Sequence, residues 1–224
     1  MNAMTKSAGT RIRHKTMTDQ VANAIRRMIL SHELEPGQRI TQAELAQMLG
    51  VSTMPVREAF VRLVSDGMLV AHGNRAFLVS QMTEARIRDI YWLHAVIAGE
   101  LTARAWDHKN KVLIAEMSRL HSEYLKAEEA KEHDQQFQIN WDFHAILNAA
   151  ADAPTLINAL MGSLQYFPES AYKIKGWREI AGNWQVGLIN QFVGGNRAGA
   201  ANVATTSIDR AADIFIDDVW KKLL

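Results

Sequence analysis

Near the start of the chain, apolar residues recur every three or four positions in three separate segments, which is the spacing of one face of an α-helix. The first segment ends before Glu35-Pro36-Gly37, which breaks a helix. The second begins at Thr41, where Glu44 three residues later completes a capping box, and it ends at Gly50. The pattern therefore predicts three consecutive short helices, the third of them capped by Ser52.

Two short runs of β-type residues follow the third helix, at 68–71 and 76–80. Between them, His72-Gly73-Asn74-Arg75 is typical of a hairpin turn. Three helices followed by a two-stranded wing is the order of a winged helix-turn-helix, which we assign to residues 16–80 as a DNA-binding domain. Residues 1–15 are polar, basic and rich in small side chains, and we interpret them as a flexible arm.

After residue 80 the β pattern disappears and only helical spacing continues. Candidate helices cover residues 83–107, 111–131, 134–151, 154–169, 177–193 and 197–222. Short breaks such as Asp152-Ala153-Pro154 separate them, and short connections favour antiparallel neighbours. The predicted fold class is therefore mostly α, with an antiparallel bundle of about six helices over residues 84–224 after the winged helix-turn-helix.

The composition is that of a globular protein. Of the 224 residues, 48% are hydrophobic and none is cysteine, which excludes disulfides, thiolate metal sites and a cysteine nucleophile. The basic start of the chain is not followed by the apolar run of a signal peptide, and no segment approaches the length of a membrane span. We expect a soluble, cytoplasmic protein with no membrane partner.

The net charge of +1 conceals an asymmetry between the two halves of the chain. Residues 1–80 hold ten Lys and Arg against six Asp and Glu, whereas the remainder holds fifteen against eighteen. A basic N-terminal part and an acidic C-terminal part indicate that only the first meets a polyanion such as DNA.

In a helix-turn-helix, the N-terminal residues of the second helix read base edges in the major groove. Here the exposed leading residues of that helix are Ser52, Thr53, Met54 and Arg57. Hydroxyl groups at a helix N-terminus suit phosphate oxygens, and an arginine binds guanine bidentately or grips a phosphate. The wing tip, residues His72, Gly73, Asn74 and Arg75, is placed to reach an adjacent minor groove or the backbone.

Two other interpretations of this segment remain open. A three-helix unit with a hairpin also serves as a protein-interaction module. Arg57 has two acidic neighbours, Glu58 and Asp66, and an arginine on a solvated face can simply pair with such residues.

The segment resembles the GntR family of transcriptional regulators, and the helical part resembles the FCD-type sensor domain of its FadR subfamily. The N-terminal resemblance covers about 65 residues, and the C-terminal one depends on helix order and scattered anchors. The matching residues are Leu34-Glu35-Pro36-Gly37-Gln38-Arg39-Ile40, Glu44-Leu45-Ala46, Leu49-Gly50-Val51-Ser52, Pro55-Val56-Arg57-Glu58-Ala59, Leu63, Asp66-Gly67, Tyr91, Gly99, Ala105 and Phe143-His144.

The resemblance implies a homodimer that binds a short DNA palindrome and responds to a small organic acid or a related metabolite. It places DNA contacts at Thr41, Ser52, Thr53, Met54, Arg57, His72 and Gly73. The chain departs from its relatives at Thr53, where they commonly carry arginine, and at Ala43 and Met48, where they often carry a basic residue. Fewer cationic contacts imply a different operator and weaker electrostatic binding.

Many FCD domains hold a metal ion with an Asp-x-x-x-His pair and two further histidines. This chain has Asn140 and His144 at the first pair, and Gln185 and Ser207 at the positions of the other two. Asn, Gln and Ser are weak neutral donors, so we expect no cofactor. If a divalent metal is bound, His144 would hold it, and His94 would supply a second imidazole if the two helices face each other.

In place of a metal site, the sequence predicts an effector site of uncharged hydrogen-bonding groups. Its members are His94, Asn140, His144, Gln185 and Ser207. Buried polar groups need partners, which a small polar metabolite less acidic than a dicarboxylate would supply. Lys173 or Arg178 is an alternative source of positive charge for a more acidic ligand. The simpler alternative is that these side chains satisfy one another.

Aromatic residues near this predicted site could wall a pocket, namely Trp141, Tyr166 and Trp184. For Trp141 and Tyr166, a place in the hydrophobic core is the expectation.

Two other classes of function compete with a ligand-responsive repressor. The chain has no His-Glu-x-x-His, phosphate loop or Gly-x-Ser-x-Gly motif, so an enzyme is not expected. A DNA-binding protein whose bundle has lost sensing and only dimerises remains the alternative.

Overall fold

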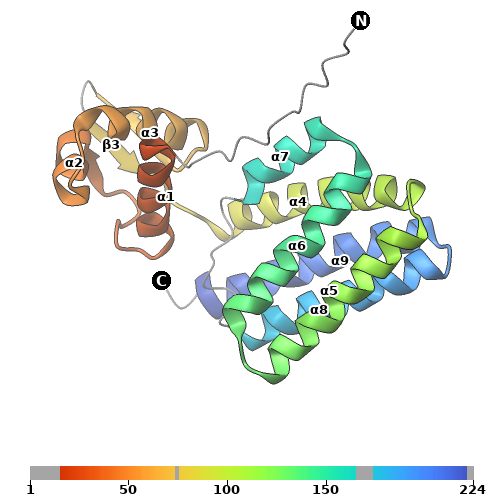
Figure 1. Ribbon diagram of the computed structural model, residues 1–224. Helices are drawn as coiled ribbons and strands as arrows, with labels where there is room; N and C mark the ends of the chain where they lie inside the picture. The colour runs from red at the N-terminus through yellow and green to blue at the C-terminus, as the bar shows by residue number, and fades with distance from the viewer. Residues whose placement is uncertain (1–15, 74–75, 165–173, 221–224) are drawn as a thin grey trace, which may run out of the picture. The chain divides into compact units, whose positions relative to one another are not determined.

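The computed structural model describes residues 16–73, 76–164 and 174–220, so the predicted arm at 1–15 lies outside the described residues. The chain divides into two compact units, and the division falls between Gln81 and Met82 in the sequence (Figure 1). Within the part of the chain that the structure describes, no helix is both long enough and apolar enough to cross a membrane.

The first unit contains the three predicted helices, α1 (Met17–Leu30), α2 (Gln42–Leu49) and α3 (Thr53–Ser65). The capping box predicted at Thr41 and Glu44 is present, and a second one joins Thr16 to Asp19 at the start of α1. Helices α1 and α3 pack against each other through apolar side chains that are almost completely buried. These side chains are Val21, Ala22, Ile25, Val56, Ala59, Phe60 and Leu63.

The wing is one strand larger than the sequence pattern predicted. Strands β2 (Leu69–His72) and β3 (Ala76–Val79) form the predicted hairpin, but β1 (Arg39–Thr41) pairs with the other edge of β3 in an antiparallel sheet of order β1-β3-β2. Three residues are too few to show an alternating pattern, so β1 exists because β3 supplies its partner. Its central residue, Ile40, lies opposite Phe77, whose ring packs edge-on against Phe60 at 4.7 Å between centroids.

In its described residues, the second unit contains the six helices that the spacing predicted. They are α4 (Glu84–Asp107), α5 (Lys111–Glu129), α6 (His133–Ala151), α7 (Pro154–Leu164), α8 (Lys175–Val193) and α9 (Arg197–Phe215), followed by a π-helical turn at Ile216–Trp220. The continuous final helix predicted to residue 222 therefore changes form at Ile216. The fold class is confirmed as mostly α, a winged helix-turn-helix followed by a helical domain.

Five of these helices close into a ring (Figure 1). Helix α4 packs on α6 and α9, α9 packs on α8, α8 packs on α5, and α5 packs on α6. The apolar interior includes Leu101, Tyr124, Phe143, Leu188 and Phe192, each at most 2% exposed. Helix α7 lies against α4. Side chains that project from α4, α5, α6, α8 and α9 toward this interior therefore meet one another.

Helices α4 and α9 approach each other closely. A Cβ atom at Gly99 would lie 2.8 Å from Cγ2 of Thr205, a distance that real Cβ atoms do not adopt. Arg197 at the start of α9 forms two hydrogen bonds of 2.8 and 2.9 Å to Asp107 at the end of α4. The two helices therefore run antiparallel.

Gly50, the residue that ends α2, has a left-handed backbone conformation with φ of 65°. We expect Gly50→Ala to lower the free energy of unfolding of the first unit by about 1–2 kcal/mol, because a Cβ atom disfavours this conformation. No heavy atom lies within 4 Å of that Cβ position, so crowding adds nothing. Urea titration measures the change. Gly50→Asn is the matched control, since asparagine tolerates left-handed backbone; equal losses in both variants would contradict this account.

Candidate DNA-reading surface and buried polar cluster

The N-terminal end of α3 presents polar side chains to solvent. Ser52, Thr53, Met54 and Arg57 are all exposed, while Val56 between them is buried and anchors the helix. Ser52 is the N-cap residue, yet its hydroxyl makes no capping hydrogen bond. The hydroxyl and the first amides of α3 are therefore available to a phosphate oxygen.

Arg57 is not held by either of the acidic neighbours considered above. Glu58 accepts a hydrogen bond of 2.6 Å from the Thr18 hydroxyl, and Asp66 forms an ion pair of 3.1 Å with Arg26. Among the described residues, no carboxylate lies within ion-pairing distance of the Arg57 guanidinium. Both contacts of its neighbours join α3 to α1, so they orient the helix and leave Arg57 exposed.

The other residues predicted to contact DNA have different surroundings. The Thr41 hydroxyl donates to the Glu44 carboxylate at 2.8 Å and accepts from the Glu44 amide, and the first of these bonds lowers the pKa of Glu44. Its side chain thus serves the capping box. His72 and Gly73 are exposed at the end of β2, and Asn74 and Arg75 lie outside the described residues.

The second candidate site consists of uncharged polar side chains from α4, α5, α6, α7 and α8 of the second unit. His94 of α4 is only 5% exposed, and its Nδ1 lies 2.9 Å from the Ser163 hydroxyl of α7. The single hydroxyl proton of Ser163 is donated to the Leu160 carbonyl at 2.8 Å. Ser163 must then accept from His94, which places the proton of the neutral imidazole on Nδ1.

A second hydrogen-bonded chain crosses three helices. The Gln185 side chain of α8, which has no exposed surface, donates from Nε2 to the Asn140 Oδ1 of α6 at 3.1 Å. Its Oε1 lies 3.1 Å from Nδ1 of His121 on α5. An amide oxygen only accepts hydrogen bonds, so the His121 nitrogen is the donor.

His144 lies one helical turn after Asn140, on the same face of α6. Its ring stacks on Trp184 with 4.2 Å between ring centroids and an angle of 20°. Burial lowers the pKa of His144 to about 4. Burial also lowers the pKa of His94 to about 3, with a smaller contribution from the charge of His144. Both imidazoles are therefore neutral at pH 7.

Gln136 extends the same face of α6 by one more turn. Its side chain has no exposed surface, and its Oε1 lies 3.0 Å from Nδ1 of His133. Among the described residues, its Nε2 has no hydrogen-bond partner. A buried donor without a partner costs about 1–3 kcal/mol, so this nitrogen is a place where a ligand oxygen would be stabilising.

Of the five residues of the predicted effector site, Asn140 and Gln185 are hydrogen-bonded to each other. His144 lies one turn from Asn140 on α6 and is near enough to His94 for its charge to act on that imidazole. Ser207 is not joined to them, because its hydroxyl donates to the Val203 carbonyl one turn back at 2.8 Å. His121, Ser163 and Gln136 also belong to these hydrogen-bonded groups and were not predicted from the sequence. The spacing of four between Gln136, Asn140 and His144 was the available signal for one of them.

The expectation that Trp141 belongs to the core is wrong. The side chain is 42% exposed, because it lies next to Asn140 in sequence and so points about 100° away from the inner face of α6. Trp184, by contrast, is buried. Tyr166 and Lys173 lie outside the described residues. The half-buried Arg178 accepts, through its carbonyl, a hydrogen bond of 2.9 Å from the Tyr124 hydroxyl.

The residues at the metal position of FCD domains do not fit a transition-metal ion here. The Asn140 oxygen already accepts from Gln185, and Asp142 is exposed and accepts from Gln138 at 2.9 Å. Within the described ranges, no three His, Asp or Glu side chains are arranged to bind a metal.

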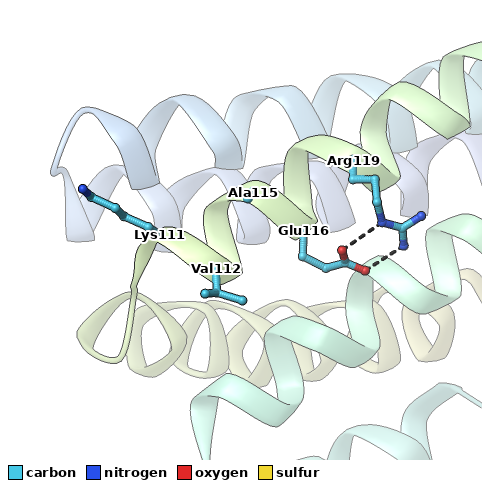
Figure 2. Close-up of a pocket in the computed structure, with 5 residues that line it drawn as sticks. All are labelled: Lys111, Val112, Ala115, Glu116 and Arg119. Atoms are coloured by element: carbon cyan, nitrogen blue, oxygen red, sulfur yellow. Dashed lines mark hydrogen bonds and ion pairs between the residues drawn. The ribbon is translucent and has the colours of Figure 1, made fainter.

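A hollow on the outer side of α5 is a different feature from this cluster (Figure 2). Lys111, Val112, Ala115, Glu116 and Arg119 line it, all of them from the first half of one helix. Arg119 pairs with Glu116 at 2.7 Å and with Glu123 at 2.6 Å. Because a single helix lines this open hollow, it would enclose little of a ligand.

The fold and the exposed recognition helix define a winged-helix regulator with a helical second domain. Residues 17–79 match the model of the "Bacterial regulatory proteins, gntR family", and residues 89–208 match the FCD domain. The chain belongs to the GntR family and carries an FCD domain, in agreement with the resemblance to the FadR subfamily.

Curated relatives with similar sequences are transcriptional regulators. The HTH-type transcriptional regulator McbR of Escherichia coli is 27% identical over 146 residues, 65% of this chain and 66% of McbR. The HTH-type transcriptional repressor RspR of the same organism is 26% identical over 137 residues, 61% of this chain and 60% of RspR. The chain thus spans less than two thirds of the length of these relatives.

Solved structures show the same fold over a larger share of the chain. E. coli McbR/YncC matches with a TM-score of 0.64 and 22% identity, covering 93% of this chain and 99% of that one. A structure described as "Lar controls the expression of the Listeria monocytogenes agr system and mediates virulence" matches with a TM-score of 0.60 and 17% identity, covering 90% and 97%. At these identities the likeness concerns the fold alone.

Proposed function

We propose that the chain is a repressor that binds a palindromic double-stranded DNA operator as a homodimer, and that a small polar metabolite in the C-terminal bundle controls this binding. The observation that carries the DNA part is the exposed, unpaired Arg57 beside the free Ser52 hydroxyl at the start of α3. A dimer would present two such helices to half-sites about one helical turn apart. The name of one relative, the repressor RspR, supports repression over activation.

The buried cluster supports a neutral effector. The buried polar side chains of the described bundle are His94, Thr102, Gln136, Ser163 and Gln185, and no Lys, Arg, Asp or Glu is among them. Among the described residues, no buried cation would pair with an anion placed there, and an unpaired buried charge is strongly unfavourable. A neutral molecule with hydrogen-bonding oxygens would instead satisfy the Gln136 Nε2 and lie beside the His144 ring.

Thermal unfolding of the full chain with neutral and carboxylate metabolites tests this proposal. A neutral ligand at about 100 times its Kd is expected to stabilise the protein by about 2.7 kcal/mol. His144→Ala and Gln136→Leu should each weaken that ligand, and Gln138→Leu, on the solvent side of α6, is the matched control. Tight binding of a simple carboxylate that His144→Ala leaves unchanged would contradict the proposal. The ligand must also change operator affinity, because one without differential affinity for the two states controls nothing.

A second candidate is a bundle that only dimerises. The hydrogen bonds of Gln185 to Asn140 and His121, and of His94 to Ser163, favour it, because these groups satisfy one another without a ligand. Under this alternative, no metabolite would shift the unfolding temperature while operator binding remained intact. In neither case do we propose an enzymatic activity, since the relatives of known name are regulators.

A further inference from the structure

An apolar patch is exposed in the middle of α4. Trp92 is 65% exposed, and Leu93 and Val96 are each 47% exposed. The three residues lie within about one helical turn, so their side chains form one continuous patch. Neighbouring positions of the same helix, such as Tyr91 and Ala95, are buried in the bundle. The patch therefore faces away from the core, and an exposed tryptophan beside aliphatic side chains is typical of a protein contact.

Charged residues flank the patch in a symmetric order. Arg88 precedes Trp92 by four residues, and Glu100 follows Val96 by four residues. All four side chains lie on one i, i+4 ridge of the helix. Consider a twofold axis that is perpendicular to the helix and crosses the ridge midway between Trp92 and Val96. It places Arg88 opposite Glu100 of a second copy, and Trp92 opposite Val96 of that copy. The charges along this ridge are therefore complementary to those of the same ridge on a second copy that runs antiparallel to it.

We propose that α4 packs antiparallel against α4 of a second copy of this chain, with Trp92 on Val96 and Arg88 facing Glu100 across a twofold axis. Ridges of this i, i+4 type pack into each other at a crossing angle of about −50°. The twofold contact uses each interaction twice, which is the property of an isologous dimer interface. A contact with a different protein would not require this self-complementary order of charges. The order therefore favours a second copy of this chain as the binding partner.

The existing ion pairs of these residues are compatible with the contact. Arg88 pairs with Glu84 at 2.9 Å and with Asp213 at 3.0 Å, and Glu100 pairs with Arg104 at 2.8 Å. All of these side chains are about half exposed. They would therefore form a polar rim around the apolar centre, the usual arrangement of an interface.

This inference specifies the homodimer of the proposed function, and charge reversal in the full chain tests it. Sedimentation equilibrium measures the dimer Kd. We expect R88E and E100R each to raise Kd about tenfold, since two exposed pairs become repulsive. The double variant R88E/E100R should restore the original Kd within about threefold, because the pairs are only exchanged. W92D should raise Kd about 100-fold or more, since it removes the apolar centre.

R119E is the matched control. Arg119 is exposed to the same degree as Arg88 and likewise bridges two carboxylates within its own subunit, but it lies on α5. It should leave Kd unchanged. A dimer insensitive to W92D, or a double variant no tighter than R88E, would overturn the proposed surface while leaving ligand and DNA binding in place. A full chain that stays monomeric at about 100 μM would overturn it together with the homodimer.

Discussion

Arg57→Ala is expected to weaken binding to the operator by a factor between about 30 and about 20,000. A bidentate arginine–guanine contact contributes about 1–3 kcal/mol of discrimination, and a dimer loses two of them. The guanidinium is available for this role because Glu58 and Asp66 are engaged with α1. Selection from a random duplex pool supplies the operator, and fluorescence anisotropy at a fixed salt concentration measures Kd.

The control for Arg57 lies on the same helix. Arg62 is held by Asp19 of α1, so Arg62→Ala removes one positive charge from α3 without removing a residue of the reading face. It should change operator affinity far less than Arg57→Ala. If Arg57 instead grips a phosphate, its loss would weaken all sequences equally and reduce the dependence of log K on log salt by about 1 per contact. Wild-type affinity and specificity in Arg57→Ala would contradict any role in DNA reading.

Acid is expected to destabilise the C-terminal unit well before its carboxylates are protonated. The folded pKa values of about 3 for His94 and about 4 for His144 lie below the ordinary value of 6.5, so the unfolded state binds more protons as the pH falls below 6.5. The contribution of each histidine is fully present above pH 6.5 and declines as the pH falls to its folded pKa, about 4 for His144 and about 3 for His94. At about 1.4 kcal/mol per pH unit, each histidine removes about 2 kcal/mol by pH 5.

Urea titrations at pH 7.5, 6 and 5, followed by tryptophan fluorescence, measure this slope. His144→Gln should remove about half of it. His94→Asn, whose amide can still donate to Ser163, should also remove about half. His72→Gln, at an exposed position of the first unit, is the control and should leave the slope as it is. A free energy of unfolding that is constant between pH 7.5 and 5 would show that the two imidazoles are not desolvated as described.

Burial disfavours charge on the two imidazoles and on a bound effector for the same reason, the loss of hydration. Protonation of His144 would place a cation beside Trp184 and near His94, which the surrounding amides do not neutralise. The cluster is therefore built for neutral groups at physiological pH, in contrast to the acidic ligands that the family resemblance implies. The thermal-shift comparison of neutral molecules with carboxylates addresses this contrast directly.

Local sequence determined most of the secondary structure and one of the two sites. Helix starts such as Thr41 and stops such as Gly50 act within three or four residues, so they could be recognised without knowledge of the fold. The order of three helices and a hairpin likewise defined the winged helix-turn-helix, and with it the exposed end of α3. The pair Asn140 and His144 was placed on one face by helical spacing alone.

Tertiary structure decided what depends on partners distant in sequence. Strand β1 exists because β3 offers it an edge, and nothing in its three residues indicates this. His121 bonds Gln185 because α5 packs on α8, and Ser163 bonds His94 because α7 packs on α4, whereas Ser207 bonds its own helix. Periodicity shows which face of a helix is apolar, but hydrogen-bond partners and desolvation are set by the neighbouring helices, and these are determined only when the chain packs.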